Sequence, residues 1–143
     1  MSCAQFASKL GRMAEVSKNE ITVPVEAVMK HVESEAKRVL GTYEYGWEPL
    51  SERTIARHGD TPLLEVGQMK AGLQTEVEKT IGGAEGLVYS QDKVALWQEM
   101  GSVNKQTGGF NPPRSFLFKS LLLATPNIAK EFSAFALKLF TIR

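Results

Sequence analysis

One helical stripe constrains the fold of this chain more than any other feature. Between residues 24 and 40, apolar side chains recur every three or four positions and fall on one face of a helix. Pro24 suits the first turn of such a helix, and Gly41 suits its C-terminal cap. We therefore expect an amphipathic helix packed on one side. The stripe consists of Val25, Val28, Met29, Val32, Ala36, Val39 and Leu40.

A second pattern, of period two, follows at residues 73–81 and is typical of a half-buried strand. Gly82, Gly83 and Gly86 then indicate a turn, and residues 87–89 supply a returning strand. A two-stranded hairpin is marginal alone, so it must pack on the long helix, gain other strands, or both. The alternating sets are Leu73, Thr75, Val77, Lys79 and Ile81 on one face, and Gln74, Glu76, Glu78 and Thr80 on the other.

Shorter segments complete the predicted domain. Residues 1–20 predict a short helix or an N-terminal arm, either flexible or docked. Residues 41–72 predict an extended connection with short helical segments at 51–58 and 63–67. A short helix at 93–100 ends at Gly101, and residues 101–113 form a polar, glycine-rich loop that we expect to be mobile.

A C-terminal helix is predicted to start at Thr125-Pro126. Its apolar face would carry Ile128, Phe132, Phe135, Ala136, Leu139 and Phe140. The expected fold class is α+β, with an antiparallel sheet packed against a long N-terminal helix and a C-terminal helix, and with long loops. We assign residues 1–143 to a single domain because the length and the 43% hydrophobic content fit one ordinary core.

Charge and cysteine content exclude several classes of protein. Lys and Arg total 17 against 16 Asp and Glu, so the net charge of +1 supplies no field to gather nucleic acid or an anionic membrane. One cysteine, Cys3, excludes an internal disulfide and a cysteine zinc site, and indicates a reducing compartment. The densest apolar stretch, residues 115–124, contains Lys119 and is too short to span a membrane, and no secretory signal is recognised.

The residue types that build catalytic and metal sites are sparse. His31 and His58 belong to no metal-binding array, and Cys3 lies in a segment expected to fray, which disfavours a Cys–His nucleophile. The pairs Gly82-Gly83 and Gly108-Gly109 lack the spacing of a phosphate-binding loop and are interpreted as turn glycines. We predict that the chain is not an enzyme and has no catalytic, cofactor-binding or metal-binding residues.

Three blocks of sequence carry more information. The first is Trp47-Glu48-Pro49-Leu50-Ser51 followed by Thr54, and the second runs from Pro62 to Lys70 as PLLEVGQMK. The third joins Trp97-Gln98-Glu99-Met100-Gly101, through a loop, to Pro112-Pro113-Arg114-Ser115-Phe116-Leu117. Trp47 and Trp97 fit either a core or an interface. Arg114 fits a buried or intersubunit carboxylate as well as an ordinary surface position.

In their order and spacing, these blocks resemble the neck and tail-completion proteins of tailed bacteriophages, also called the virion morphogenesis or minor-tail family. The resemblance covers about residues 25–140. It departs from the family pattern at Met69, where leucine is usual, at Ser115, where a second proline is usual, and in the length of the loop between Gly101 and Pro112.

The resemblance implies a virion component, made in the cytoplasm of the bacterial host, that joins head to tail or completes the tail tube. It would form a ring with itself around the DNA channel, bind other neck or tail proteins such as the connector or the tail tube, and let DNA pass only as cargo. No cofactor and no membrane would be involved. Interface candidates are Trp47, Trp97, Glu99, Lys105, Phe110, Pro113, Arg114 and Phe116, and channel-facing candidates are Gln74, Glu76 and Glu78.

Other classes remain as alternatives. A small non-enzymatic scaffold domain would need no virus, and a DNA-binding regulator module would need a recognition helix longer than the 51–58 segment. Arg53, Arg57 and His58 form only a small basic cluster there. A small enzyme would need a cleft with a strongly shifted carboxylate.

Overall fold

Helix α2 (Thr22–Val39) is the central element of the computed structural model, which describes residues 2–64 and 67–141. The predicted stripe is confirmed, with Val28, Val32, Ala36 and Val39 buried along the helix. The helix ends where Leu40 turns to an extended conformation and Gly41 takes a positive φ of 90°. A Cβ on Gly41 would lie 2.8 Å from Leu64, so both the backbone and the packing require glycine at this end.

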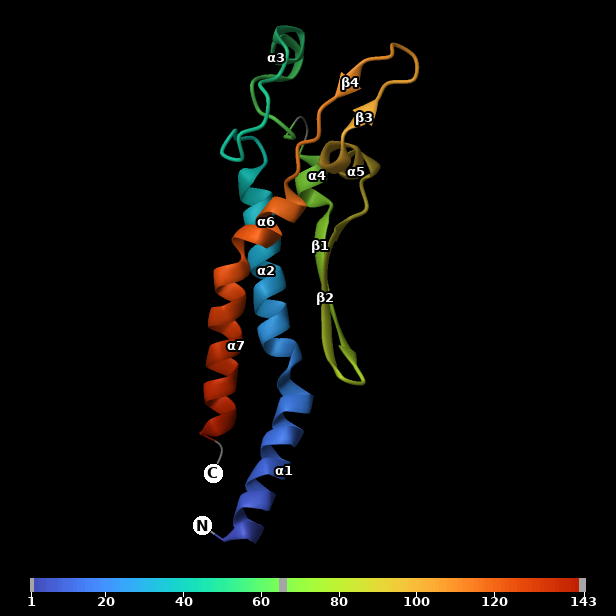
Figure 1. Cartoon of the computed structure of the whole chain (residues 1–143). Helices are drawn as coiled ribbons and strands as arrows, with labels where there is room; N and C mark the ends of the chain where they lie inside the picture. The colour runs from blue at the N-terminus through green and yellow to red at the C-terminus, as the bar shows by residue number, and fades with distance from the viewer. Residues whose placement is uncertain (1, 65–66, 142–143) are drawn as a thin grey trace.

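Helix α1 (Cys3–Glu20) precedes α2 and forms with it one long, bent helical rod (Figure 1). The predicted short helix or arm is therefore a regular helix of 18 residues, started by a capping box between Ser2 and Gln5. The bend has a simple cause. Pro24 lacks the N–H that would bond to the carbonyl of Glu20, and its ring crowds that carbonyl.

The β-hairpin is confirmed as β1 (Leu73–Thr80) paired antiparallel with β2 (Gly83–Ser90). Leu73 pairs with Ser90 and Thr80 with Gly83, which leaves a two-residue turn. The face carrying Leu73 and Thr75 packs on α2 and is more buried than the opposite face. The prediction for Ile81 is wrong, because this residue lies in the turn and is fully exposed.

The C-terminal half adds helices and a second, short hairpin. Helix α5 (Lys93–Met100) lies where the sequence predicts it, with Asp92 as its N-cap and Gly101 as its C-cap. Part of the expected loop at 101–113 is paired as β3 (Ser102–Val103) and β4 (Phe110–Asn111). Helix α6 (Leu117–Leu123) leads into α7 (Thr125–Phe140), whose predicted face is half-buried except for Phe140.

Two small helices lie in the connection between α2 and the first hairpin. Helix α3 (Glu52–His58) is confirmed, with Ser51 as its N-cap and Gly59 after its last turn. Helix α4 (Gln68–Ala71) follows the predicted segment at 63–67, of which residues 65 and 66 lie outside the described residues.

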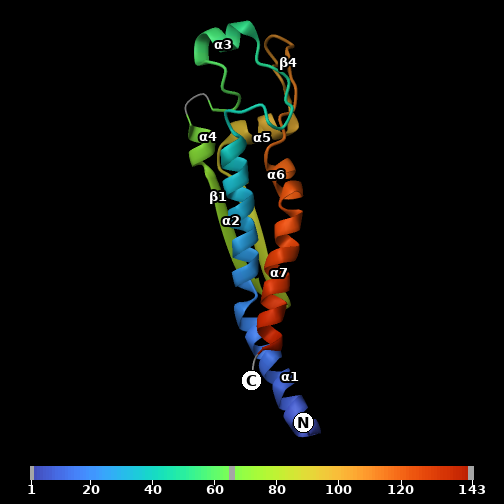
Figure 2. The same cartoon turned by 90° about the vertical axis from the view of Figure 1, so that its left-hand side faces the viewer.

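The whole molecule is elongated, with α2 contacting the β1–β2 hairpin, α6 and α7 along its length (Figures 1 and 2). The main core lies toward the C-terminal end of α2, where α4, α5 and α6 converge; it comprises Ala36, Val39, Leu40, Tyr45, Met69, Leu73, Ala95 and Phe116. Helix α3 and the β3–β4 hairpin project beyond this core at the end opposite the chain termini (Figure 1). The mixed helix-and-sheet class predicted from the sequence is confirmed. Among the described helices, none has the length and apolar character needed to cross a bilayer.

Candidate functional site

The first and third sequence blocks meet at the end of the molecule that carries α3 and α5. The Trp47 ring N–H donates to the Ser115 carbonyl at 3.3 Å, and Arg114 Nη2 donates to the Glu48 carbonyl at 3.3 Å. The Arg114 backbone N–H donates to the Gln98 carbonyl at 2.6 Å. We call this set of contacts among residues 47–48, 98–99 and 114–118 the motif junction.

Glu99 organises the motif junction by capping α6. One oxygen of its carboxylate accepts the backbone N–H groups of Phe116 and Leu117, at 2.8 and 3.0 Å. The other accepts the Phe118 N–H at 3.0 Å and the Ser115 hydroxyl at 2.6 Å. Because α6 has no capping side chain of its own, Glu99 satisfies N–H groups that would otherwise lack partners. The link between the Trp-Gln-Glu-Met-Gly block and the Pro-Pro-Arg-Ser-Phe-Leu block is therefore a tertiary helix cap.

A hydroxyl network ties the same end of the molecule to α2. The Tyr45 hydroxyl lies 2.8 Å from the Ser120 hydroxyl and donates to Glu35 at 3.2 Å. Burial raises the pKa of Tyr45, and the Arg38 guanidinium, hydrogen-bonded to Glu35, lowers the pKa of Glu35. The Tyr45 ring also packs edge-to-face on Trp47, with centroids 5.7 Å apart, which holds the first block against the core.

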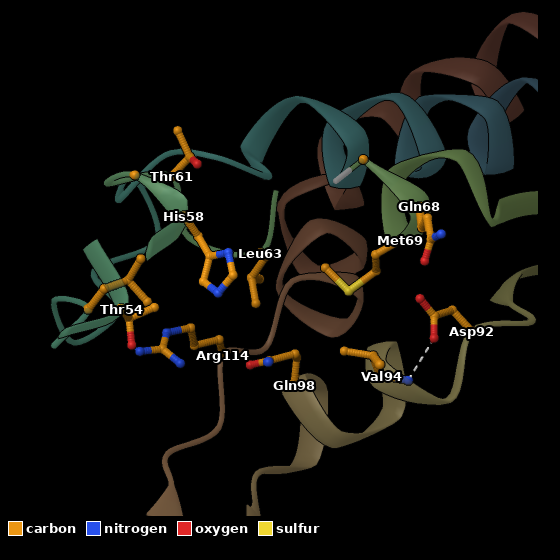
Figure 3. A pocket seen from close by; sticks show the side chains of 13 residues that line it. Thr54, His58, Thr61, Leu63, Gln68, Met69, Asp92, Val94, Gln98 and Arg114 are labelled. Atoms are coloured by element: carbon orange, nitrogen blue, oxygen red, sulfur yellow. Dashed lines mark hydrogen bonds between the residues drawn. The ribbon is translucent and has the colours of Figure 1, made fainter. Parts of the chain in front are cut away.

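A pocket of about 220 Å³ lies beside the motif junction (Figure 3). Its walls come from α3, α4 and α5 and from the segment before α6. Arg114 and Gln98 line one part of it and Asp92 another, with His58 on the side of α3. Arg114 is only 8% exposed, and its Nε has no hydrogen-bond partner. The Oε1 atom of Gln98 is likewise buried without a partner.

The structure divides the eight predicted interface residues into two groups. Trp97 is 53% exposed and Phe110 is 65% exposed, and Lys105 is exposed between β3 and β4, so these three side chains are open to a partner. Phe116 is 0% exposed in the core. The other four lie inside or beside the motif junction: Trp47, Glu99, Pro113 and Arg114. These four residues shape the fold at this end of the molecule. Phe116, in the core, exposes no surface that another subunit could contact.

The three predicted channel-facing residues share the exposed face of the β1–β2 hairpin. Gln74, Glu76 and Glu78 all point away from α2, and Gln74 accepts a hydrogen bond from the Tyr89 hydroxyl at 3.1 Å. The strand register of the β1–β2 hairpin adds to this face one residue that the sequence analysis did not identify. Glu85 pairs directly with Glu78 across the strands, so the acidic face comprises Glu76, Glu78 and Glu85. The signal was available, because a hairpin with this turn places residues 78 and 85 opposite each other.

Sequence reasoning also missed exposed apolar surface on the short helices. On α5 and the β3–β4 hairpin, the exposed side chains follow one another along the chain; they are Leu96, Trp97, Met100, Val103 and Phe110. Val103 and Phe110 are cross-strand partners. We call this set the α5–hairpin surface. A second set on α6 consists of Phe118, Leu121, Leu122 and Leu123. A helix as short as α6, with apolar residues on several sides, gave no clear periodicity in the sequence.

Within residues 2–64 and 67–141, no group of three or more His, Cys, Asp or Glu side chains is arranged to hold a metal ion. No protein-family model, curated protein or solved structure matches this chain, so the geometry described above carries the functional argument. That geometry offers three features: a capped junction with a buried arginine, an acidic strand face, and exposed apolar surfaces.

Proposed function

We propose that this chain is a non-enzymatic structural subunit of a tailed phage or prophage virion. It would assemble with itself into a ring around the DNA channel and join head to tail or complete the tail tube. The sequence resemblance suggests this role, and one structural observation supports the self-association on which it depends. The folded chain exposes far more surface than a compact monomer of its mass.

The surface area can be compared with the usual scaling. A compact monomer of 15.8 kDa exposes about 7300 Å² by the general relation between area and mass. This chain exposes 9729 Å². The difference, about 2400 Å², exceeds what a protein contributes to a standard-size interface, about 800 Å². A subunit with contacts on two sides, as in a ring, would use surface on this scale.

The exposed apolar side chains favour association over a solitary rod. An elongated monomer could carry extra area as polar surface, but here large apolar side chains are exposed along α5, the β3–β4 hairpin and α6. Exposed apolar surface of this kind marks interaction sites in natural proteins. Because the two sets lie on different elements, a contact between one of them and the other would be head-to-tail, and such contacts form a ring where the rotation between subunits closes.

The acidic hairpin face is compatible with a DNA channel. Glu76, Glu78 and Glu85 repel phosphate, so a ring lined by these faces would let DNA pass without binding it. The oligomeric state distinguishes the ring from the scaffold alternative, because a ring requires self-association and a scaffold domain does not.

Light scattering over a concentration series tests the proposal. The wild-type chain is expected to reach one defined mass of several subunits. A double variant, Val103→Ser/Phe110→Ser, removes apolar contacts from the α5–hairpin surface and is expected to shift the chain toward monomer. The matched control, Val23→Ser/Ile81→Ser, changes two exposed apolar residues elsewhere and should retain the wild-type mass.

Electron microscopy then distinguishes a ring from an open filament or a compact dimer. Particles with a central hole support the ring. A wild-type chain that stays monomeric at every concentration, or a control variant that dissociates as readily as the hairpin variant, would contradict assembly through this surface and favour the scaffold alternative.

A further inference from the structure

Arg114 is a buried cation for which the described residues supply no counter-ion. The side chain is 8% exposed, and its one hydrogen bond within the protein is the 3.3 Å contact from Nη2 to the Glu48 carbonyl. Its Nε is buried and unpaired, and no described carboxylate forms an ion pair with the guanidinium. A buried charge that is left uncompensated is strongly destabilising. Within the described part of the chain, the Arg114 guanidinium therefore has no carboxylate that offsets the cost of its burial.

The surroundings of Arg114 form a small site rather than a tight core. The guanidinium lines the pocket together with Thr54 and His58, and the unpaired Gln98 Oε1 lies on the same wall (Figure 3). The single described carboxylate in the lining, Asp92, is committed to another role, because it caps α5 through the Val94 N–H at 2.9 Å. The pocket thus offers the guanidinium N–H donors of Arg114, and Asp92 is the one carboxylate among its described lining residues.

We propose that this pocket receives the carboxylate of an Asp or Glu side chain from a neighbouring protein subunit. A guanidinium presents a planar fork that matches a carboxylate with two parallel N–H···O bonds. The volume of about 220 Å³ is below the usual range for small-molecule and cofactor sites, roughly 300–1,000 Å³, and suits one inserted side chain. One permanent cation balances one carboxylate, whose two oxygens match the planar fork. The source of the carboxylate rests on the proposed function, but the existence of the site does not.

Binding of glutarate to the purified chain tests the site directly. Glutarate carries the side-chain carboxylate of glutamate, and glutaramide is its uncharged counterpart. In ¹⁵N NMR spectra, the Nε–H resonance of Arg114 is expected to shift saturably with glutarate and not with glutaramide. Inorganic phosphate is the third probe. No saturable shift with glutarate, or stronger binding of phosphate than of glutarate, would overturn the proposal.

Two variants distinguish binding at Arg114 from general binding of anions to the protein. Arg114→Lys retains the charge but loses the fork, and should weaken glutarate binding about tenfold. Arg53→Lys is the matched control on the exposed side of α3 and should leave binding unchanged. Equal binding by wild type and Arg114→Lys would place the anion elsewhere and overturn the proposal.

Thr54→Glu gives a second test that does not depend on Arg114→Lys folding. Thr54 lines the pocket on the side of the guanidinium (Figure 3), so a glutamate there would supply the missing carboxylate from within the chain. This variant should raise the melting temperature and abolish the glutarate response. A variant that melts lower and still binds glutarate would count against the site. Because these measurements use the chain and a small molecule, they succeed or fail independently of ring formation.

Discussion

Glu99 receives four hydrogen bonds from a single short segment of the chain. Each of its oxygens accepts two hydrogen bonds from residues 115–118. In Glu99→Gln, one oxygen becomes an NH₂ group that donates and cannot accept, so two donors lose their partner whichever way the amide is turned. Hydrogen bonds to charged groups contribute about 1.5–3 kcal/mol each, so we expect the free energy of unfolding to fall by about 2 kcal/mol or more.

Urea denaturation of the wild type and of Glu99→Gln measures this change in the free energy of unfolding. Glu52→Gln is the control, because Glu52 is an exposed residue of α3 and a surface change of this type is usually within about 0.5 kcal/mol. If Glu99→Gln were no more destabilised than the control, the carboxylate would not be the cap of α6.

Glu33 links α2 to the β1–β2 hairpin through a pH-sensitive contact. The hydrogen bond from the Lys37 ammonium lowers the pKa of Glu33 below its ordinary value of 4.5, and the Thr75 hydroxyl lowers it further. Because the pKa in the folded state is depressed, the stabilisation is present above the unfolded pKa and is lost as the pH falls through the folded one. The stability difference between wild type and Glu33→Gln should therefore shrink as the pH is lowered from about 5 to about 3.

Chemical denaturation at a series of pH values checks this dependence. Glu52→Gln again serves as the reference for loss of an exposed carboxylate. A difference between wild type and Glu33→Gln that stays constant over the whole acid range would show that the Glu33 contacts do not favour the ionised carboxylate.

At the scale of elements, Gly86 sets the distance between β2 and α2. A Cβ at this position would lie 2.4 Å from Met29 Cγ and 2.8 Å from Val25 Cγ1, so the hairpin and the helix would have to separate or repack. Overpacking of this kind costs about 1–3 kcal/mol. We expect Gly86→Ala to lower the free energy of unfolding by that amount. Gly83→Ala, on the same strand with open space around its Cβ, is the matched control.

Thermal and urea unfolding of the two alanine variants distinguish packing from backbone effects. Both changes remove a strand glycine, so both gain the same intrinsic preference for an ordered backbone. Only Gly86→Ala adds a methyl group against α2. Equal stability of the two variants would mean that the hairpin does not lie this close to the helix.

Elements with strong periodicity or clear end signals were predictable from the sequence. The stripe of α2, the alternation of β1 and the short helices at 51–58 and 93–100 correspond to physical requirements that act within one turn or one strand. The full length of α1 was not predictable, because none of its residues is buried and its pattern is weak. The β3–β4 pairing was missed because two-residue strands carry no period.

At the scale of the whole molecule, the sequence grouped the right blocks but could not assign their roles. Glu99 and Arg114 were singled out as interface candidates, but the sequence did not indicate that Glu99 caps α6 or that Arg114 is buried beside a pocket. Such roles depend on which segments meet in space, and the meeting of residues 48, 98 and 114 spans nearly half of the chain. The elongated shape was equally hidden, because it follows from the near-linear arrangement of α1 and α2 (Figure 2).

The acidic hairpin face provides the prediction that belongs to the whole assembly. Glu76→Lys/Glu78→Lys adds two charges at each site and raises the net charge from +1 to +5. If these strand faces line the channel, oligomers of the variant should retain duplex DNA at about 0.15 M salt, because ring symmetry would repeat the lysines around the DNA. The wild-type oligomer should not retain it.

A control variant with the same net charge tests whether DNA retention depends on the position of the lysines or on the total charge. Glu15→Lys/Glu52→Lys also reaches +5, with the lysines on α1 and α3 instead of the hairpin. DNA retention, measured on filters with matched oligomer concentrations, should be confined to the hairpin variant and should fall steeply with added salt. Equal retention by the two variants would mean that total charge governs binding, and the hairpin face would lose its assignment to the channel.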